Sequence, residues 1–186
     1  MNSRTQNILE AAQIVFARYG VSKTTMSDIA REAGVARQTV YNAFATKNEV
    51  LREVVRLEIK RSIAATQEAW TATRSLEERI EAFHQNGPLR WYQVLCSSPE
   101  MADLLEGMND IANEEMQRGE AAWKSLFVKM LNDLGVRSRD PKVTIADLAD
   151  YIFYTAKNAK YGVQDLESLQ RRLQVSKRSV LMMTDV

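Results

Sequence analysis

Hydrophobic residues recur at spacings of three and four along the first part of the chain, which predicts an amphipathic helix. The residues expected on its inner face are Ile8, Leu9, Ala12, Val15, Phe16 and Tyr19. Gly20 follows directly, where a left-handed residue can end a helix. This pattern predicts that the chain opens with a helix packed on one side.

A second and a third helix follow, with a tight turn between them. Thr25 and Asp28 have the spacing of a capping box, which predicts the start of the second helix. Gly34 tolerates the positive φ of a sharp turn. The third helix is expected over Arg37–Phe44, with Val40 pointing inward. This spacing is typical of a helix-turn-helix, which lays its second helix in the major groove of DNA.

Longer segments with the same periodicity fill the rest of the chain. A fourth helix is expected over about 47–72, and others over 76–86, 89–96, 100–108, 110–134, 144–159 and 165–183. The Gly87-Pro88 pair is expected to stop the helix before it. The fold class is therefore all-α, with about nine helices. Residues 1–50 would form a helix-turn-helix DNA-binding domain, residues 51–186 a helical effector-binding and dimerisation domain, and the fourth helix would link them.

Composition and charge agree with this organisation. Only seven Gly and three Pro occur in 186 residues. The one cysteine excludes an internal disulfide and suits a reducing cytosol, so a cytoplasmic location is expected. No apolar run approaches the roughly 20 residues that span a membrane. Residues 1–62 carry ten Lys and Arg against six Asp and Glu, whereas residues 63–186 carry fifteen against eighteen. A basic first third suits a polyanion partner such as DNA.

The segment 34–51 resembles the signature of the tetracycline-repressor (TetR) family of bacterial regulators. The matching residues are Gly34, Val35, Thr39, Val40, Tyr41, Phe44, Lys47 and Leu51, and segments 16–20 and 24–35 are similar as well. The family often has Ser at the position of Ala36, where it caps the recognition helix, and alanine cannot accept that hydrogen bond. The resemblance implies a ligand-responsive transcriptional regulator, a repressor, that binds a palindromic operator as a homodimer and is released by a small apolar or amphipathic effector.

Polar residues around the second and third helices are the candidate DNA contacts. Gln38 is the candidate for direct base reading, because its amide can bond the N6 and N7 of adenine together. Arg37 reads a guanine or holds a phosphate, and both roles stay open. The resemblance implies that Tyr41 and Lys47 are phosphate anchors. The alternatives are a solvated charge for Arg37 or Lys47 and a core-covering ring for Tyr41. The full set is Arg4, Thr25, Ser27, Arg37, Gln38, Thr39, Tyr41, Asn42 and Lys47.

Two further surfaces are expected in the second domain. Aromatic and methionine side chains of the middle segment could line an effector pocket, although such a stripe also forms plain core. These candidates are Phe83, His84, Trp91, Met101, Met108, Met116, Trp123 and Phe127. The last two helices predict a four-helix bundle with a second subunit, and the alternative is burial within one subunit. The expected contact residues are Leu148, Ile152, Phe153, Ala156, Leu166, Leu169, Leu173 and Val180.

Enzymatic chemistry has no support in the sequence. One His and one Cys do not make a metal cluster, and Glu81-x-x-His84 is half of a di-iron motif without its second copy. No glycine-rich phosphate loop or nucleophile elbow occurs. We therefore expect no catalytic residue, metal or cofactor. The competing function is a DNA-bound scaffold of the same fold that recruits a protein partner and has no small-molecule effector.

Overall fold

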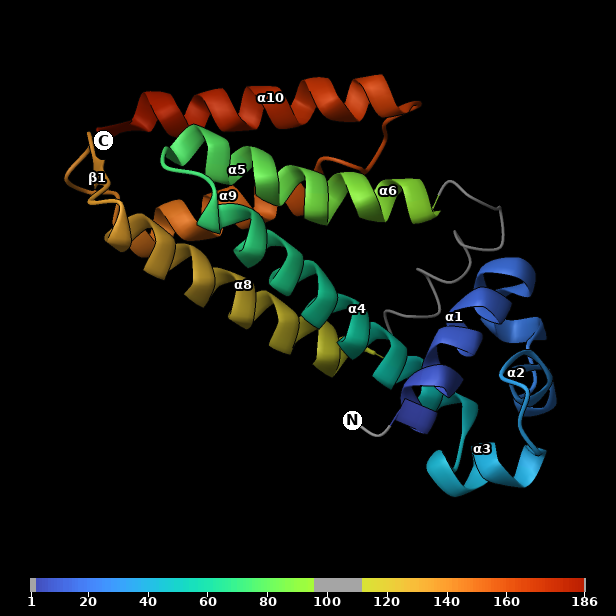
Figure 1. The fold of residues 1–186 in the computed structure, drawn as a ribbon. Coiled ribbons are helices and arrows are strands. Elements are labelled where there is room, and N and C mark those ends of the chain that lie inside the picture. The colour runs from blue at the N-terminus through green and yellow to red at the C-terminus, as the bar shows by residue number, and fades with distance from the viewer. Residues whose placement is uncertain (1–2, 96–111, 186) are drawn as a thin grey trace. The chain divides into compact units, whose positions relative to one another are not determined.

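The computed structural model describes residues 3–95 and 112–185, and these residues fold almost entirely into helices (Figure 1). The all-α prediction is confirmed, whereas the helix expected over 100–108 lies outside the described residues. The elements are α1 (Ser3–Lys23), α2 (Met26–Glu32), α3 (Arg37–Ala43), α4 (Lys47–Thr71), α5 (Leu76–His84), the π-helix η1 (Gln85–Leu89), α6 (Arg90–Leu95), α8 (Asn113–Asp133), α9 (Ile145–Asn158), α10 (Leu166–Met183) and the two-residue strands β1 (Arg137–Ser138) and β2 (Thr184–Asp185).

The chain divides into two compact units. The first holds residues 1–59 and 94–117, and the second holds residues 60–93 and 118–186. Because α4, α6 and α8 each contribute residues to both units, none of the three boundaries falls at a helix end. No helix in the described part of the chain is long and apolar enough to cross a membrane.

The core of the first unit comes from the predicted stripe of α1 together with residues of α2, α3 and α4. Tyr19 is the exception, because its ring is 42% exposed. Gly20 has φ 78°, which favours glycine, and the backbone kinks there before continuing to Lys23. The buried side chains are Ile8, Leu9, Ala12, Val15, Phe16, Ile29, Ala30, Val40, Phe44, Val50 and Leu51.

Side-chain caps define where several helices begin. Thr25, Ser75 and Thr144 each accept from the N–H three residues later, and an acidic residue there accepts from the cap's own N–H. The capping box predicted at Thr25 is confirmed, and those at Ser75 and Thr144 have the same spacing of three residues. Thr46 accepts from the Glu49 N–H in the same way, whereas the Glu49 carboxylate reaches the N–H of Ala45.

The expected stop at Gly87-Pro88 is wrong, because α5 continues through η1 into α6. Pro88 has no N–H for the carbonyl four residues before it, and a π-helix satisfies the backbone with a wider turn. Gly87 is needed for packing, since a Cβ there would lie 3.0 Å from the ring of Phe83.

The second unit has an apolar core of side chains from α4, α5, α8, α9 and α10. Within it α10 runs along α5 and α9 (Figure 1). The loop predicted over 135–143 contains β1, whose residues Arg137 and Ser138 pair antiparallel with Asp185 and Thr184. The N–H of Arg139 also donates to the carbonyl of Met183. These contacts fix the end of α10 to that loop.

The uncapped start of α3 provides a test of the local energetics. Ala36 occupies the N-cap position with extended backbone and makes no side-chain cap bond. Ala36→Ser should therefore raise the free energy of unfolding by about 1 kcal/mol. Thr25→Ala, which removes an existing cap, should lower it by about the same amount. Urea unfolding followed by circular dichroism measures both changes, and a neutral or destabilising Ala36→Ser would contradict this account of α3.

Candidate nucleic-acid interface and effector site

Helix α3 presents its polar side chains outward from the first unit. Val40 is fully buried and Phe44, at the C-cap, is 5% exposed. On the opposite side Arg37, Gln38 and Asn42 are exposed. The helix therefore has one apolar edge held by the core and one polar edge open to a partner.

The exposed side chains of α3 form two pairs, each one helical turn apart. The Arg37 guanidinium donates to the Tyr41 hydroxyl at 3.2 Å and lies 5.2 Å from the centre of its ring. The Gln38 amide donates to Asn42 Oδ1 at 2.9 Å. Gln38 keeps its carbonyl oxygen and a second N–H for another partner. Such i,i+4 contacts restrict the rotamers of both side chains before any ligand binds.

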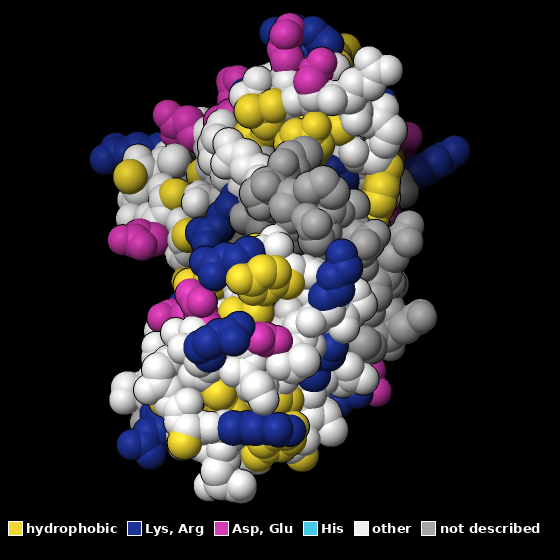
Figure 2. All heavy atoms as spheres, turned by 90° about the vertical axis from the view of Figure 1, so that its right-hand side faces the viewer, with side chains coloured by type: hydrophobic (Ala, Val, Ile, Leu, Met, Phe, Trp, Pro, Cys, Tyr) yellow, Lys and Arg dark blue, Asp and Glu magenta, His cyan; other side chains and the backbone are white. Residues whose placement is uncertain are grey.

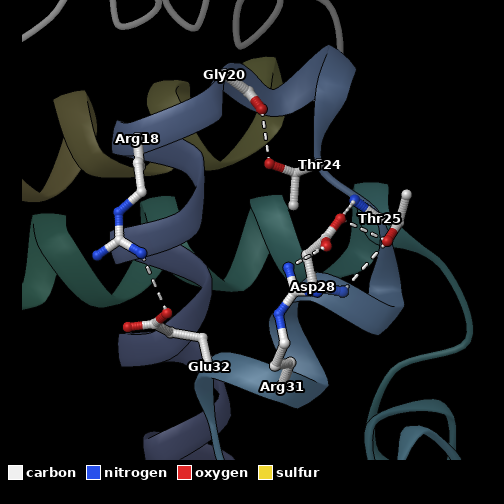
Figure 3. A network of polar contacts seen from close by, with 7 residues as sticks. All are labelled: Arg18, Gly20, Thr24, Thr25, Asp28, Arg31 and Glu32. Carbon is white, nitrogen blue, oxygen red and sulfur yellow. Dashed lines mark hydrogen bonds and ion pairs between the residues drawn. The ribbon is translucent and has the colours of Figure 1, made fainter.

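A polar network fixes the start of α2 (Figure 3). The Thr25 hydroxyl donates to Asp28 Oδ2 at 2.6 Å, and Arg31 donates to Asp28 Oδ1 at 2.7 Å. Hydrogen bonds from Thr25 hold the pKa of Asp28 below its usual value. Buried Thr24 donates to the carbonyl of Gly20 at 2.7 Å. Thr25 is therefore first of all a helix cap, and both Thr25 and Ser27 are exposed.

Lys47 lies in a different setting from the one expected. Its ammonium donates to the backbone carbonyls of Val21, Thr24 and Ser22 at 2.5, 2.8 and 3.3 Å. The side chain is half-buried, and its hydrogen-bonding groups point into the protein. The expectation that Lys47 mainly anchors a phosphate does not follow from this geometry.

Two contacts between α1 and the end of α2 were missed by sequence reasoning. Asn7 donates to the carbonyl of Ala33 at 2.9 Å, and Arg18 forms an ion pair with Glu32 at 3.4 Å. Neither pair has a spacing signal, because the partners are 26 and 14 residues apart. Both position α2 against α1.

The remaining DNA candidates vary in exposure. Arg4 and Ser27 are exposed and Thr39 is half-buried. Figure 2 shows Lys and Arg side chains scattered over one face of the molecule among exposed hydrophobic side chains, rather than gathered in one patch. Of the three candidates, Arg4 and Ser27 are therefore more accessible to a partner than Thr39 is.

Four effector candidates come together in the core of the second unit. Phe83 lies with its ring centre 4.9 Å from Trp123 and 4.8 Å from Phe127, and 5.8 Å from the ring of His84. Trp91 and Met116 are half-buried, and Met116 belongs to the first unit. Met101 and Met108 lie outside the described residues. Sequence reasoning missed Trp70, whose ring is 6.0 Å from Phe127.

His84 is a buried polar residue beside this aromatic group. It is 1% exposed, and its Nδ1 has no hydrogen-bond partner within residues 3–95 and 112–185. Burial lowers the pKa of His84 from 6.5 to about 4, opposed by the Glu81 carboxylate and assisted by the Lys177 ammonium. The imidazole is therefore neutral at pH 7. The Thr66 hydroxyl, on α4 in the same unit, is fully buried and also lacks a hydrogen-bond partner among the residues that the structure describes.

The residues expected at a subunit interface are instead core residues of their own chain. Seven of the eight are buried in the second unit, and Leu166 packs against them. Periodicity located the apolar stripes of α9 and α10, and in this chain both stripes belong to the core of the second unit. The buried seven are Leu148, Ile152, Phe153, Ala156, Leu169, Leu173 and Val180.

Among the described residues, no group of three or more His, Cys, Asp and Glu side chains is placed to hold a metal ion. The charged side chains around Lys177 in the second unit form an ion-pair network instead. Lys177 pairs with Glu81 at 2.9 Å and with Glu77 at 3.3 Å, and Gln174 donates to Glu81. This network joins α10 to α5.

Comparison with known proteins places this geometry in context. Residues 8–54 match the family model of bacterial regulatory proteins, tetR family. The uncharacterized HTH-type transcriptional regulator YfiR of Bacillus subtilis (strain 168) is 30% identical over 112 residues, which are 60% of this chain and 46% of that protein. The probable acrEF/envCD operon repressor of Escherichia coli (strain K12) is 43% identical over 49 residues, 26% of this chain and 22% of that one. The matches thus span less than half of either curated relative.

The whole chain also resembles solved structures. The structure of a SmeT–triclosan complex has a TM-score of 0.66 and covers 100% of this chain and 93% of that chain, at 21% identity. At this identity the likeness shows a common fold. The fold therefore extends over both units, beyond the segment that the family model matches.

The neutral His84 gives the protein a predictable dependence on pH. Because its pKa is lower in the folded than in the unfolded protein, unfolding takes up a proton between pH 6.5 and about 4. The stabilising contribution is complete above pH 6.5 and is lost as the pH falls through this window. We expect the loss from His84 to reach about 3 kcal/mol. Urea unfolding from pH 7 to pH 4 measures it.

The matched variant for this measurement is His84→Leu, which keeps a similar volume and cannot titrate. Carboxylates with lowered pKa, such as Asp28 and Asp147, destabilise both proteins alike as the pH falls. As the pH falls, the unfolding free energy of the wild-type protein should therefore decrease more than that of His84→Leu. A difference that stays constant with pH would show that His84 is not held neutral by burial.

Proposed function

This chain belongs to the tetR family of bacterial regulatory proteins, and we propose that it is a repressor that binds a palindromic operator as a homodimer and releases it when a small apolar or amphipathic effector binds. The observation that carries the proposal is the two-sided character of α3. Its Val40 edge is buried, while Arg37, Gln38 and Asn42 are exposed. A helix of this kind, following a tight turn, is the element that enters the major groove.

Base reading is assigned to Gln38. Its carbonyl oxygen would accept from adenine N6 and its second N–H would donate to N7. Asn42 holds the first N–H and so orients the amide for that bidentate contact. The paired Arg37 and Tyr41 lie one turn along the same edge, where the guanidinium reaches a guanine or a phosphate and the hydroxyl a phosphate.

The start of α2 is assigned to the DNA backbone. Thr25 and Ser27 are exposed at a helix N-terminus, where N–H groups and hydroxyls suit a phosphate. Arg4 on α1 and Thr39 on α3 complete the proposed contacts to the DNA backbone. These contacts fix the position of α3 on the duplex and carry no sequence preference themselves.

A dimer suits this mode of binding, because two recognition helices about 34–36 Å apart meet successive major grooves on one side of DNA. The inner stripes of α9 and α10 are buried within this chain, so another face is proposed for the dimer contact. We assign it to the outer side of α10, where Val175 is 64% and Met182 is 73% exposed. A second copy would remove these apolar side chains from water.

An effector is supported by the aromatic core of the second unit. Phe83, Trp123 and Phe127 would supply an apolar lining, and the His84 and Thr66 atoms that lack a partner among the described residues would supply hydrogen bonds. A neutral imidazole favours an uncharged or amphipathic ligand over an anion. One structural neighbour was solved in complex with triclosan. Binding would release DNA only if the ligand has unequal affinity for the two states.

Selection from a random duplex pool tests the DNA-binding proposal directly. The full chain should enrich duplexes that contain an inverted repeat, with half-sites about one helical turn apart. Binding should weaken steeply with salt, as phosphate contacts require. Equal affinity for selected and random duplexes at physiological salt would contradict the proposal.

Gln38→Ala tests the assignment of base reading on a selected duplex. The variant should lose about 1–3 kcal/mol of preference for adenine at one position of each half-site while keeping its preference elsewhere. Gln117→Ala is the matched control, because Gln117 makes the same kind of amide contact to Asn113 one turn away. If Gln38→Ala weakened binding to all sequences equally, Gln38 would be a backbone contact instead.

The dimer assignment is tested by Val175→Glu, which places a charge on the outer side of α10. Burying that charge without a partner should weaken dimerisation by about 2 kcal/mol or more. Sedimentation velocity over a range of concentrations measures the change. Ile14→Glu is the control, since Ile14 is a 47% exposed apolar residue of α1. An unchanged dimer for Val175→Glu would exclude this face.

A further inference from the structure

The ammonium of Lys47 is surrounded by backbone acceptors from the turn between α1 and α2. Val21, Ser22 and Thr24 contribute one carbonyl each, at 2.5, 3.3 and 2.8 Å. A lysine ammonium has three hydrogens and no acceptor. Three carbonyls therefore match its whole donor capacity.

The charge of Lys47 is also suited to this place. Carbonyls at a helix C-terminus have no N–H partner within the helix and carry the negative end of its dipole. α1 ends at Lys23, three residues beyond its kink at Gly20, so the carbonyls of Val21 and Ser22 lie in the short turn that follows the kink. A cation held there satisfies these groups and is itself satisfied. The contact joins segments 23–26 residues apart in the chain.

The third carbonyl links this contact to the proposed DNA interface. It belongs to Thr24, which directly precedes Thr25, the N-cap of α2. Thr24 is 2% exposed and donates its hydroxyl to the carbonyl of Gly20. The peptide that carries Thr25 is thus fixed from two directions, by Thr24's own side chain and by Lys47.

We propose that Lys47 is a positioning residue for DNA binding: its ammonium clamps the α1–α2 turn to the start of α4 and so sets the place from which Thr25 and Ser27 meet the DNA backbone. This rests on the proposed function. A direct phosphate contact would require the ammonium to give up carbonyls that then lack a donor, which costs free energy.

The two roles of Lys47 predict different measurements. Lys47→Met removes the charge and keeps the length of the side chain. If Lys47 is the clamp, amide hydrogen exchange in the DNA-free protein should become faster over residues 21–29. Operator affinity should fall about tenfold or more, while the slope of log K against log salt stays unchanged. A phosphate anchor predicts unchanged exchange and a slope lowered by about one.

Two matched variants complete the experiment. Lys47→Arg keeps the cation and several donors, so it should restore most of the exchange protection and of the affinity. Lys60→Met removes a charge from an exposed lysine of the same helix and should leave the exchange over residues 21–29 unchanged. A Lys47→Met chain whose first unit does not fold, beside a folded Lys47→Arg, would also support the clamp, because the free protein does not need a phosphate anchor to fold.

Unchanged exchange together with a reduced salt slope for Lys47→Met would overturn the proposal. The exchange measurement needs no DNA, so its outcome is separate from the outcome for the proposed function. If the wild-type chain bound no duplex, the clamp would still be tested, whereas its role in DNA binding would fall together with the proposed function.

Discussion

The first unit depends on satisfying the end groups of very short helices. α2 and α3 have seven residues each, too few to be stable alone in water. Thr25 caps the start of α2, and Asn7 donates to the carbonyl of Ala33 at its end. Lys47 does the same for the last turn of α1. Donors from neighbouring helices therefore supply what a longer helix would supply from within, and they fix the angles between the helices at the same time.

α3 differs from these helices because no side chain caps its start, and this fits the role proposed for it. Ala36 gives it no side-chain cap, and Val40 is its one buried residue. Most of the helix surface is left for contacts outside the chain, which is what reading a groove requires. The pairs Arg37–Tyr41 and Gln38–Asn42 stabilise it by a few tenths of a kcal/mol each. A helix held this weakly can complete its ordering when a duplex binds.

Sequence reasoning succeeded where the cause of a structure is local. The capping boxes at Thr25 and Thr144 depend on residues three apart, so spacing reveals them. It failed where the partner is distant: Ile152 lies on a predicted apolar stripe, yet the pattern does not say which helix covers it. The acceptors of Lys47 are more than twenty residues away, and a long flexible side chain leaves no periodic trace of its target. At Pro88 the error was different. Proline lacks a backbone N–H, and the chain can accommodate this either by ending the helix or by widening one turn, as it does here.

In the second unit a charged contact joins two helices, whereas in the first unit hydrogen bonds at helix ends do so. Burial alone would lower the pKa of Lys177, but its hydrogen bond and ion pair with Glu81 raise it, so the charge stays on α10 against α5. His84 lies on α5, three residues after Glu81. Protonating it would add a second positive charge near Lys177 in an apolar setting. The imidazole therefore stays neutral, and its Nδ1 finds no hydrogen-bond partner in the described part of the chain. A ligand that satisfies this nitrogen would bind without disturbing the charged contact. One that displaces α5 must also break the Lys177–Glu81 pair, and that difference can give it unequal affinity for two states of this unit.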